Sequence, residues 1–271
     1  MTQFNMKRFG TLLKCHLLEE RRNLLRMFLG FTLGLLFLQI FFTEVNGYAA
    51  DEAAYLEKVE QAVTISLVVI MFGMLGCASA IFQNIRDKRP RTTFFMLPAS
   101  TVEKFLVRFV WSTVVAFVIW MAAFVVADVL RMLASLLIGH EGMTSGITML
   151  FDFSDLSGLS EGIGYLALFV IANGLFNHAV YTLGGTIFRR QPFIVTTLLL
   201  LVLLTLVVWA WHSPSILGDV QLITLNDNIV TVHPLYYAIV AILLVLAAVC
   251  YWLAWRCFSR MPLITNKWLN V

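Results

Sequence analysis

Long apolar stretches separated by short polar connections are the main pattern along this chain. They predict membrane-spanning helices near 27–43, 62–85, 105–130, 163–188, 192–211 and 235–256. Their apolar cores, such as 109–127 in the third, contain no Asp, Glu, Lys or Arg. A helix needs about 20 mostly apolar residues to cross a hydrocarbon layer of about 30 Å. The sequence therefore predicts an all-α membrane protein with six transmembrane helices.

The basic residues are divided unequally between the two ends of these predicted spans. Of the 19 Lys and Arg residues, 17 lie in the N-terminal stretch, the second and fourth connections and the C-terminal segment. The other two, Lys58 and Arg131, lie in connections on the opposite side. Basic flanks stay cytoplasmic because they resist translocation. This pattern predicts an N-in and C-in topology, with both termini in the cytoplasm.

Composition leaves little room for a soluble domain, because 60% of the 271 residues are hydrophobic. The longest polar connections hold about two dozen residues, whereas an independent core takes roughly 50 or more. We therefore expect one membrane domain over 1–271. The basic residues follow the predicted membrane edges instead of forming a separate patch, which argues against a nucleic-acid partner.

The sequence gives little support for catalysis by this chain. It contains no GxxxxGK[ST] motif, so the chain is not itself a P-loop ATPase, and it contains no HExxH. The four cysteines form no CxxC pair and no Cys/His cluster with metal-ligand spacing. We therefore expect no catalytic residue, no cofactor and no metal site, and an intramembrane enzyme is the weakest interpretation.

Residues 1–26 are predicted to form an amphipathic helix that lies in the membrane interface. Such a helix anchors the chain on the lipid headgroups or contacts a partner protein. The apolar positions recur near helical spacing at Met6, Phe9, Leu13, Leu17 and Leu24. The basic positions follow another face with a period of seven, at Lys7, Lys14 and Arg21.

The basic connection at 86–104, after the second predicted span, is the first candidate site. It carries an apolar patch at 94–97, expected to be exposed between Pro90 and Pro98. Ser100 and Glu103 match a capping box, which predicts a helix that starts there and continues into the third span. A motor subunit could push on this patch; alternatively, the patch dips into the inner leaflet. The expected contact residues are Arg91, Phe94, Phe95, Met96, Leu97, Pro98, Ser100, Glu103 and Lys104.

Polar residues near the middle of the fourth predicted span form a second candidate site. Asn173, Asn177 and His178 lie close together in the sequence. Polar side chains at this depth turn toward other helices or water, so we expect this face to point inward. Hydrogen bonds between helices explain the pattern well, and lining of a substrate pathway is the alternative.

The remaining connections give more local predictions. Gly184, Gly185 and the Arg189–Arg190 pair predict a tight cytosolic helical hairpin. Asp128 and Arg131, three residues apart, predict an ion pair at the outer surface, and the connection at 139–162 is expected to be irregular. Around 226–228, β-branched residues flank an Asn-Asp-Asn sequence, which is typical of a β-hairpin; a re-entrant or surface-lying segment is the alternative.

Taken in order, these features resemble the membrane subunit of an ABC-2-type transporter. The likeness rests on the amphipathic N-terminal helix, six spans, the basic connection after the second span and the C-in topology. Two segments are similar to ones in a bacterial group of ABC-2-like permeases: residues 96–105, MLPASTVEKF, and 183–190, LGGTIFRR.

The resemblance implies a transporter made of two permease subunits, alike or different, and two separate ATP-binding cassette subunits. It implies that 86–104 couples to the ATPase, which alone holds ATP, and that the N-terminal helix contacts it too. The fifth span offers only Thr196, Thr197 and Thr205 as polar groups, which fits a largely apolar or amphipathic cargo. The resemblance implies a bacterial inner membrane, and we expect export of an unknown substrate. The alternative is a membrane scaffold, immunity or sensor protein that transports nothing.

Overall fold

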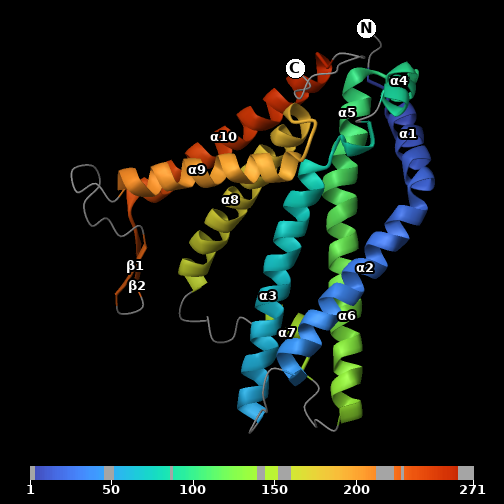
Figure 1. Ribbon diagram of the computed structural model, residues 1–271. Helices are drawn as coiled ribbons and strands as arrows, with labels where there is room; N and C mark the ends of the chain where they lie inside the picture. The colour runs from blue at the N-terminus through green and yellow to red at the C-terminus, as the bar shows by residue number, and fades with distance from the viewer. Residues whose placement is uncertain are drawn as a thin grey trace. The chain divides into compact units, whose positions relative to one another are not determined.

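The computed structural model describes residues 4–45, 52–85, 88–138, 144–151, 160–211, 223–226 and 229–261. These residues are mostly helical, with one small sheet (Figure 1). Six helical segments are long and apolar enough to cross a membrane: Arg21–Val45, Ala53–Ile85, Thr101–Ile138, Gly164–Ile187, Pro192–Trp209 and Pro234–Ser259. The prediction of a multi-pass helical membrane protein is therefore confirmed.

The chain folds into two compact units, which are described separately. Unit 1 comprises Met1–Met74 and Val102–Phe153, and unit 2 comprises Leu75–Thr101 and Ser154–Val271. The chain passes between them inside the second span, at the start of the third, and again after Phe153. The expectation of one membrane domain stays a prediction.

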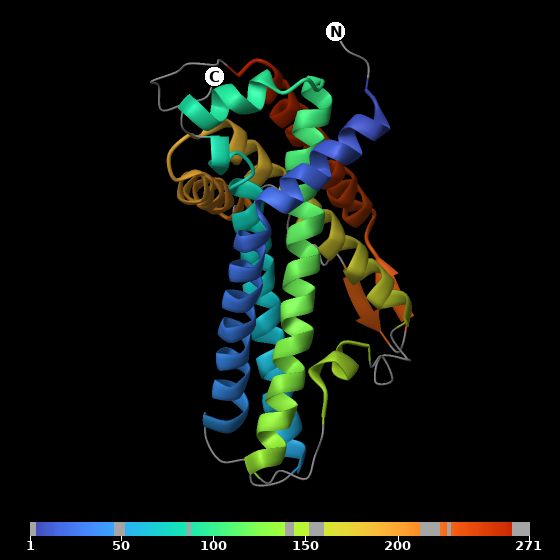
Figure 2. The same ribbon diagram turned by 90° about the vertical axis from the view of Figure 1, so that its right-hand side faces the viewer.

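Unit 1 is built from helices that run alongside one another. It contains α1 (Met6–Glu19), α2 (Arg21–Ile40), the π-helical turn η1 (Phe41–Val45), most of α3 (Glu52–Ser79), α5 (Thr101–Val110), the π-helical turn η3 (Trp111–Val115), α6 (Ala116–Ile138) and α7 (Gly146–Phe151). Figure 2 shows α2 packed beside α6. Their core holds buried Leu35, Val59 and Phe124, and the Phe31 ring stacks on Trp120 with centroids 3.7 Å apart.

The N-terminal segment is not one continuous helix, so the prediction for 1–26 was wrong in extent. Asn5 caps α1, because its side-chain Oδ1 accepts hydrogen bonds from the amides of Lys7 and Arg8. The chain then leaves helical geometry at Glu20, where ψ is 3°. The first spanning helix starts at Arg21, directly after this break.

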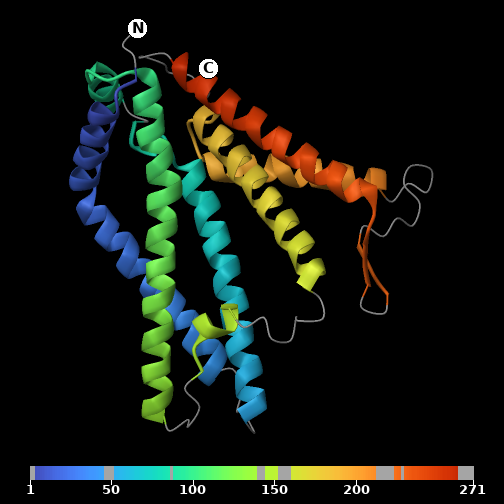
Figure 3. The ribbon, with the colours of Figure 1, turned by 180° about the vertical axis from the view of Figure 1, so that it is seen from behind.

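Unit 2 contains the end of α3, η2 (Gln83–Ile85), α4 (Lys88–Met96), α8 (Ser160–Ile187), α9 (Pro192–Trp211), β1 (Ile223–Asn226), β2 (Ile229–Val232) and α10 (Pro234–Ser259). α8 packs along α10, as Figure 3 shows, around buried Ala172, Tyr236 and Val240. β1 and β2 pair antiparallel with Asn226 opposite Ile229, so the predicted hairpin is confirmed. Its turn, 227–228, lies outside the described residues.

Candidate functional site

The predicted coupling segment forms a short helix that docks on the last span. α4 places Phe94 and Phe95 against Phe258 of α10, with ring centroids 6.5 Å and 5.6 Å apart, and Phe82 stacks on the same ring at 4.8 Å. Phe258 is fully buried at the centre of this group, which we call the phenylalanine cluster. Aromatic burial of this kind contributes strongly to packing. α4 is thereby joined to the sixth span.

This docking corrects the expectation of an exposed apolar patch at 94–97. Phe94 is only 9% exposed, whereas Met96 is 78% exposed. We predicted the apolar patch but no helix that carries it. The helical geometry of α4 turns the two phenylalanines toward α10 and leaves Met96 on the outer side. Phe95, Leu97 and Ser100 are half-buried, Pro98 is exposed, and Arg91 and Lys104 are buried.

The start of the third span holds the N-terminal helix in place within unit 1. α5 begins at Thr101, as the capping box predicts, and continues through η3 into α6. The buried Glu103 carboxylate accepts a hydrogen bond from the Asn5 amide at 2.8 Å and receives two from Arg8, at 2.7 Å from Nη2 and 3.0 Å from Nε. Hydrogen bonds to a charged group are among the stronger ones in proteins. This contact raises the pKa of Arg8.

A second contact between α1 and the third span involves a buried histidine. The His16 ring lies 4.6 Å from the Trp111 ring, and Arg108 Nη1 donates to His16 Nε2 at 3.4 Å. Burial, and then the nearby Arg108 charge, lower the pKa of His16 to about 4. His16 is therefore neutral at physiological pH, which the donated hydrogen bond requires. Sequence reasoning singled out neither residue.

The polar residues of the fourth predicted span separate into two environments on α8. His178 Nδ1 lies 2.9 Å from the Tyr251 hydroxyl of α10, which confirms the expected hydrogen bonding between helices. The Asn177 side-chain amide instead donates to the backbone carbonyl of Asn173 at 2.9 Å. Asn173 is exposed in the single chain, so the expected inward face stays a prediction at this position. The structure does not bring the three residues into one site.

The glycine pair at the end of α8 packs directly against two other helices. A Cβ atom on Gly184 would overlap the Thr196 side chain of α9, and one on Gly185 would overlap the Ser79 carbonyl oxygen of α3. Glycine is therefore required at both positions by close approach. α9 begins at Pro192, directly after Gln191, whose φ of 48° turns the chain. The predicted tight hairpin is confirmed.

A buried polar network in unit 1 extends the predicted Asp128–Arg131 ion pair. The pair is confirmed at 2.8 Å, but both side chains are fully buried instead of lying at a surface. Arg131 also donates to the Tyr55 hydroxyl at 3.3 Å, and this hydroxyl lies 2.8 Å from the Ser135 hydroxyl, which donates to Glu44 at 2.8 Å. The network therefore joins η1, α3 and α6.

Asp128 also organises part of the connection between the third and fourth predicted spans. Its carboxylate accepts hydrogen bonds from the Ser145 hydroxyl at 2.8 Å and from the amides of Gly146 and Ile147 at 3.2 Å and 3.3 Å. These amides are the first ones of α7, which a carboxylate stabilises. The expectation of irregular structure was therefore wrong at Gly146–Phe151. Residues 139–143 and 152–159 lie outside the described residues.

A serine motif at the start of α8 resembles a catalytic pattern. Residues 158–162, GLSEG, match GxSxG, a motif that we expected the chain to lack. In hydrolases this serine sits between a strand and a helix at the end of a sheet. Ser160 begins α8, residues 152–159 lie outside the described ones, and the described strands form only the β1–β2 hairpin. This arrangement gives no reason to infer a hydrolase.

Comparison of the chain with known protein families, with curated proteins and with solved structures gives no match.

Proposed function

We propose that this chain is the permease subunit of an ATP-driven transporter of the ABC-2 type. It pairs with a second permease subunit, and a separate ATP-binding cassette protein hydrolyses the ATP. The chain resides in a bacterial inner membrane with both termini in the cytoplasm, and it exports an amphipathic substrate. The six apolar helices and the one-sided distribution of basic residues support this proposal.

The observation that carries the proposal is the way both expected ATPase-contacting elements are fastened to spans. Glu103, at the start of the third span, holds the N-terminal helix through Asn5 and Arg8. Phe258, near the end of the sixth span, holds α4 through the phenylalanine cluster. A displacement of either element by the ATPase would therefore be transmitted to a transmembrane helix instead of being absorbed by a flexible loop.

In this mechanism the ATPase moves α4 when it closes on ATP. The phenylalanine cluster passes this motion to α10, and α8 follows because it packs along α10. The chain also leads from α4 through 97–100 into α5. Rigid packing of this kind transmits a displacement because cores deform little.

Purification of the full chain in mild detergent tests the proposed partner. We expect an ATP-binding cassette protein to co-elute, together with a second permease subunit. If the chain elutes repeatedly without any ATPase, the transporter proposal fails, and a scaffold, immunity or sensor protein becomes the better interpretation.

Substitution of Met96 tests the proposed contact surface. Met96→Ser removes an exposed apolar side chain from α4, so we expect ATPase stimulation by the permease to fall about tenfold while insertion is unchanged. Leu137→Ser is the matched control, since Leu137 is 89% exposed at the other end of the third span. Equal stimulation by the two variants would remove α4 from the contact.

A further inference from the structure

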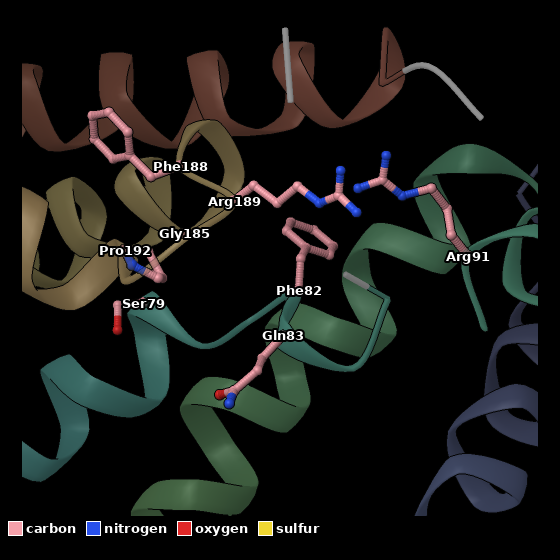
Figure 4. A pocket seen from close by; sticks show the side chains of 8 residues that line it. All are labelled: Ser79, Phe82, Gln83, Arg91, Gly185, Phe188, Arg189 and Pro192. Carbon is pink, nitrogen blue, oxygen red and sulfur yellow. The ribbon is translucent and has the colours of Figure 1, made fainter. Parts of the chain in front are cut away.

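The polar pocket of unit 2 is too small to hold a ligand. It lies between the ends of α3, α8 and α9, and Ser79, Gln83 and Arg189 are among its lining residues (Figure 4). Its interior has room for about one water molecule. A much larger surface without an assigned role lies in unit 1, along the third span.

An exposed apolar stripe runs along α6, which Figure 2 shows beside α2. Its positions are three or four residues apart, so they share one face of the helix, opposite the face that holds buried Trp120 and Phe124. Apart from Ala122, its side chains are 43–58% exposed. The stripe consists of Val118, Ala122, Val125, Val129, Leu133 and Leu136.

Two contacts relate the far part of α6 to the neighbouring helix α3. The Tyr55 hydroxyl of α3 lies 2.8 Å from the Ser135 hydroxyl of α6. A Cβ atom on Gly146 would meet both the Val63 side chain of α3 and the Asp128 carboxylate of α6. The segment of α3 between residues 55 and 63 therefore lies at the level of residues 128–135 of α6.

This level lies outside the hydrocarbon layer. Glu57 and Glu60 are exposed on this segment of α3, and an exposed carboxylate inside hydrocarbon is costly. Val129, Leu133 and Leu136 are therefore beside water, whereas the rest of the stripe continues into the apolar part of the span. Contiguous apolar side chains in water mark a contact surface, so lipid alone does not account for the stripe.

A partner for the whole stripe needs an apolar face that crosses the bilayer and continues beyond it. Among the described helical segments, the third span is the longest, at 38 residues. The next longest, Ala53–Ile85 with 33 residues, carries Glu57 and Glu60 on the part that lies beside water. The face that matches the stripe in length and polarity is therefore the same stripe on another copy of the chain.

We propose that two copies of this chain pair along their α6 stripes, around a two-fold axis normal to the membrane. Both copies have the same orientation in the bilayer, so the water-exposed part of one stripe meets that of the other. The stripe carries no charge, so no like charges oppose each other, and Ala122 lets the two helices approach closely. The inference rests on the proposed second permease subunit, which it identifies as a second copy of the chain.

Cysteine cross-linking in native membranes tests the pairing on the full chain. With the four natural cysteines replaced by serine, single cysteines are introduced as Val129→Cys or Leu136→Cys, and disulfides are formed with copper phenanthroline. Glu57→Cys is the matched control, because Glu57 is exposed at the same level on α3. A disulfide needs Cα atoms within about 7 Å, so we expect at least about tenfold more covalent dimer from the stripe positions.

A charge placed on the stripe tests the same contact without cross-linking. Leu133→Glu sets two carboxylates against each other in the pair, so we expect co-purification of two differently tagged copies to fall about tenfold. Gln61→Glu adds the same charge at an exposed position of α3 and should leave co-purification unchanged. The thermal unfolding midpoint of each variant shows whether the single chain is still folded, as the 51% exposure of Leu133 leads us to expect.

Three results would overturn the inference: no covalent dimer from either stripe position, as much dimer from Glu57→Cys, or equal co-purification by Leu133→Glu and Gln61→Glu. The fate of the transporter proposal is separate. Cross-linking along the stripe with no co-eluting ATPase would remove the transporter and keep the pairing, whereas a bound ATPase without cross-linking would do the opposite.

Discussion

At the scale of single residues, the buried Asp128–Arg131 ion pair is the feature that depends most on its surrounding contacts. Both side chains are withdrawn from solvent, and each makes further hydrogen bonds, Asp128 to the start of α7 and Arg131 to the Thr144 carbonyl oxygen at 2.7 Å. Burial of charge is costly, and good geometry with additional hydrogen bonds offsets this cost. The pair therefore stabilises unit 1 only while both partners are present.

Removal of one partner should destabilise the protein strongly. Asp128→Ala leaves Arg131 buried without its carboxylate, and we expect a loss of about 3–5 kcal/mol in unfolding free energy. Chemical unfolding of the purified chain measures this loss. The double variant Asp128→Ala with Arg131→Leu is the control, because it removes both charges and should recover much of the stability. A double variant as unstable as Asp128→Ala alone would contradict the account.

Acidification should weaken the docking of the N-terminal helix. The pKa of His16 is about 4 in the folded chain, below its ordinary value of 6.5, so the unfolded chain binds the extra proton first. The contribution of neutral His16 to the free energy of unfolding is therefore complete above about pH 7. Between pH 6.5 and pH 4 this contribution falls by up to about 1.4 kcal/mol per pH unit. Protonation also removes the acceptor that Arg108 uses.

Comparison with His16→Gln isolates this effect from other titrating groups. Unfolding midpoints of the two proteins are measured from pH 7.5 to pH 4.5. The difference between them should stay constant above pH 7 and shrink below pH 6.5, because glutamine does not titrate. Parallel curves over the whole range would show that His16 does not control the acid response.

Contacts between residues close in the sequence could be predicted, whereas contacts between distant residues could not. Asp128 and Arg131 are three residues apart, so helical spacing is enough to predict their pairing. Tyr55 contacts Arg131 across 76 positions of the sequence. Glu44 contacts Ser135 across 91 positions. No local sequence pattern indicates contacts between such distant residues. The same holds for Glu103, whose capping-box position gave no sign of its contact with Arg8.

At the scale of whole elements, the apolar runs and the turn residues were sufficient to predict the spans and the β-hairpin. Two helices were missed, α4 and α7, because both are short and depend on distant partners. α4 packs on Phe258, and α7 is capped by Asp128. Short isolated helices are marginal in water, so tertiary contact decides whether they form.

The glycine pair allows a sharp test of helix packing. Gly185→Ala places a methyl group against the Ser79 carbonyl oxygen, and we expect about 1–3 kcal/mol of destabilisation from overpacking. Gly174→Ala is the matched control in the same helix, since no atom lies within 4 Å of its added Cβ. It should be neutral or slightly stabilising because alanine favours helix. SDS-induced unfolding measures both, and equal effects would contradict the packing argument.

At the scale of the whole molecule, the proposal depends on which ends of the spans face the cytoplasm. Basic residues gather at one set of span ends, and the exposed Cys15 lies in the N-terminal helix on that side. Leu137, 89% exposed, lies at the opposite end of the third span. These two positions are suitable reporters for the two faces of the membrane.

Cysteine labelling in intact cells tests the N-in and C-in topology. With Cys77, Cys250 and Cys257 replaced by serine, we expect a membrane-impermeant maleimide to label Leu137→Cys from outside at once. Cys15 should react only after the membrane is permeabilised. Labelling in the opposite order would reverse the topology and place α4 on the outer face, out of reach of an ATPase.

The third span is much longer than a bilayer is thick. Its helical segment, Thr101–Ile138, has 38 residues, and at about 1.5 Å per residue it measures about 57 Å against a hydrocarbon layer of about 30 Å. Part of this helix therefore extends beyond the hydrocarbon layer as a stiff rod. An antibody fragment raised against this rod would be a rigid fiducial for aligning particles of so small a membrane protein in electron cryomicroscopy.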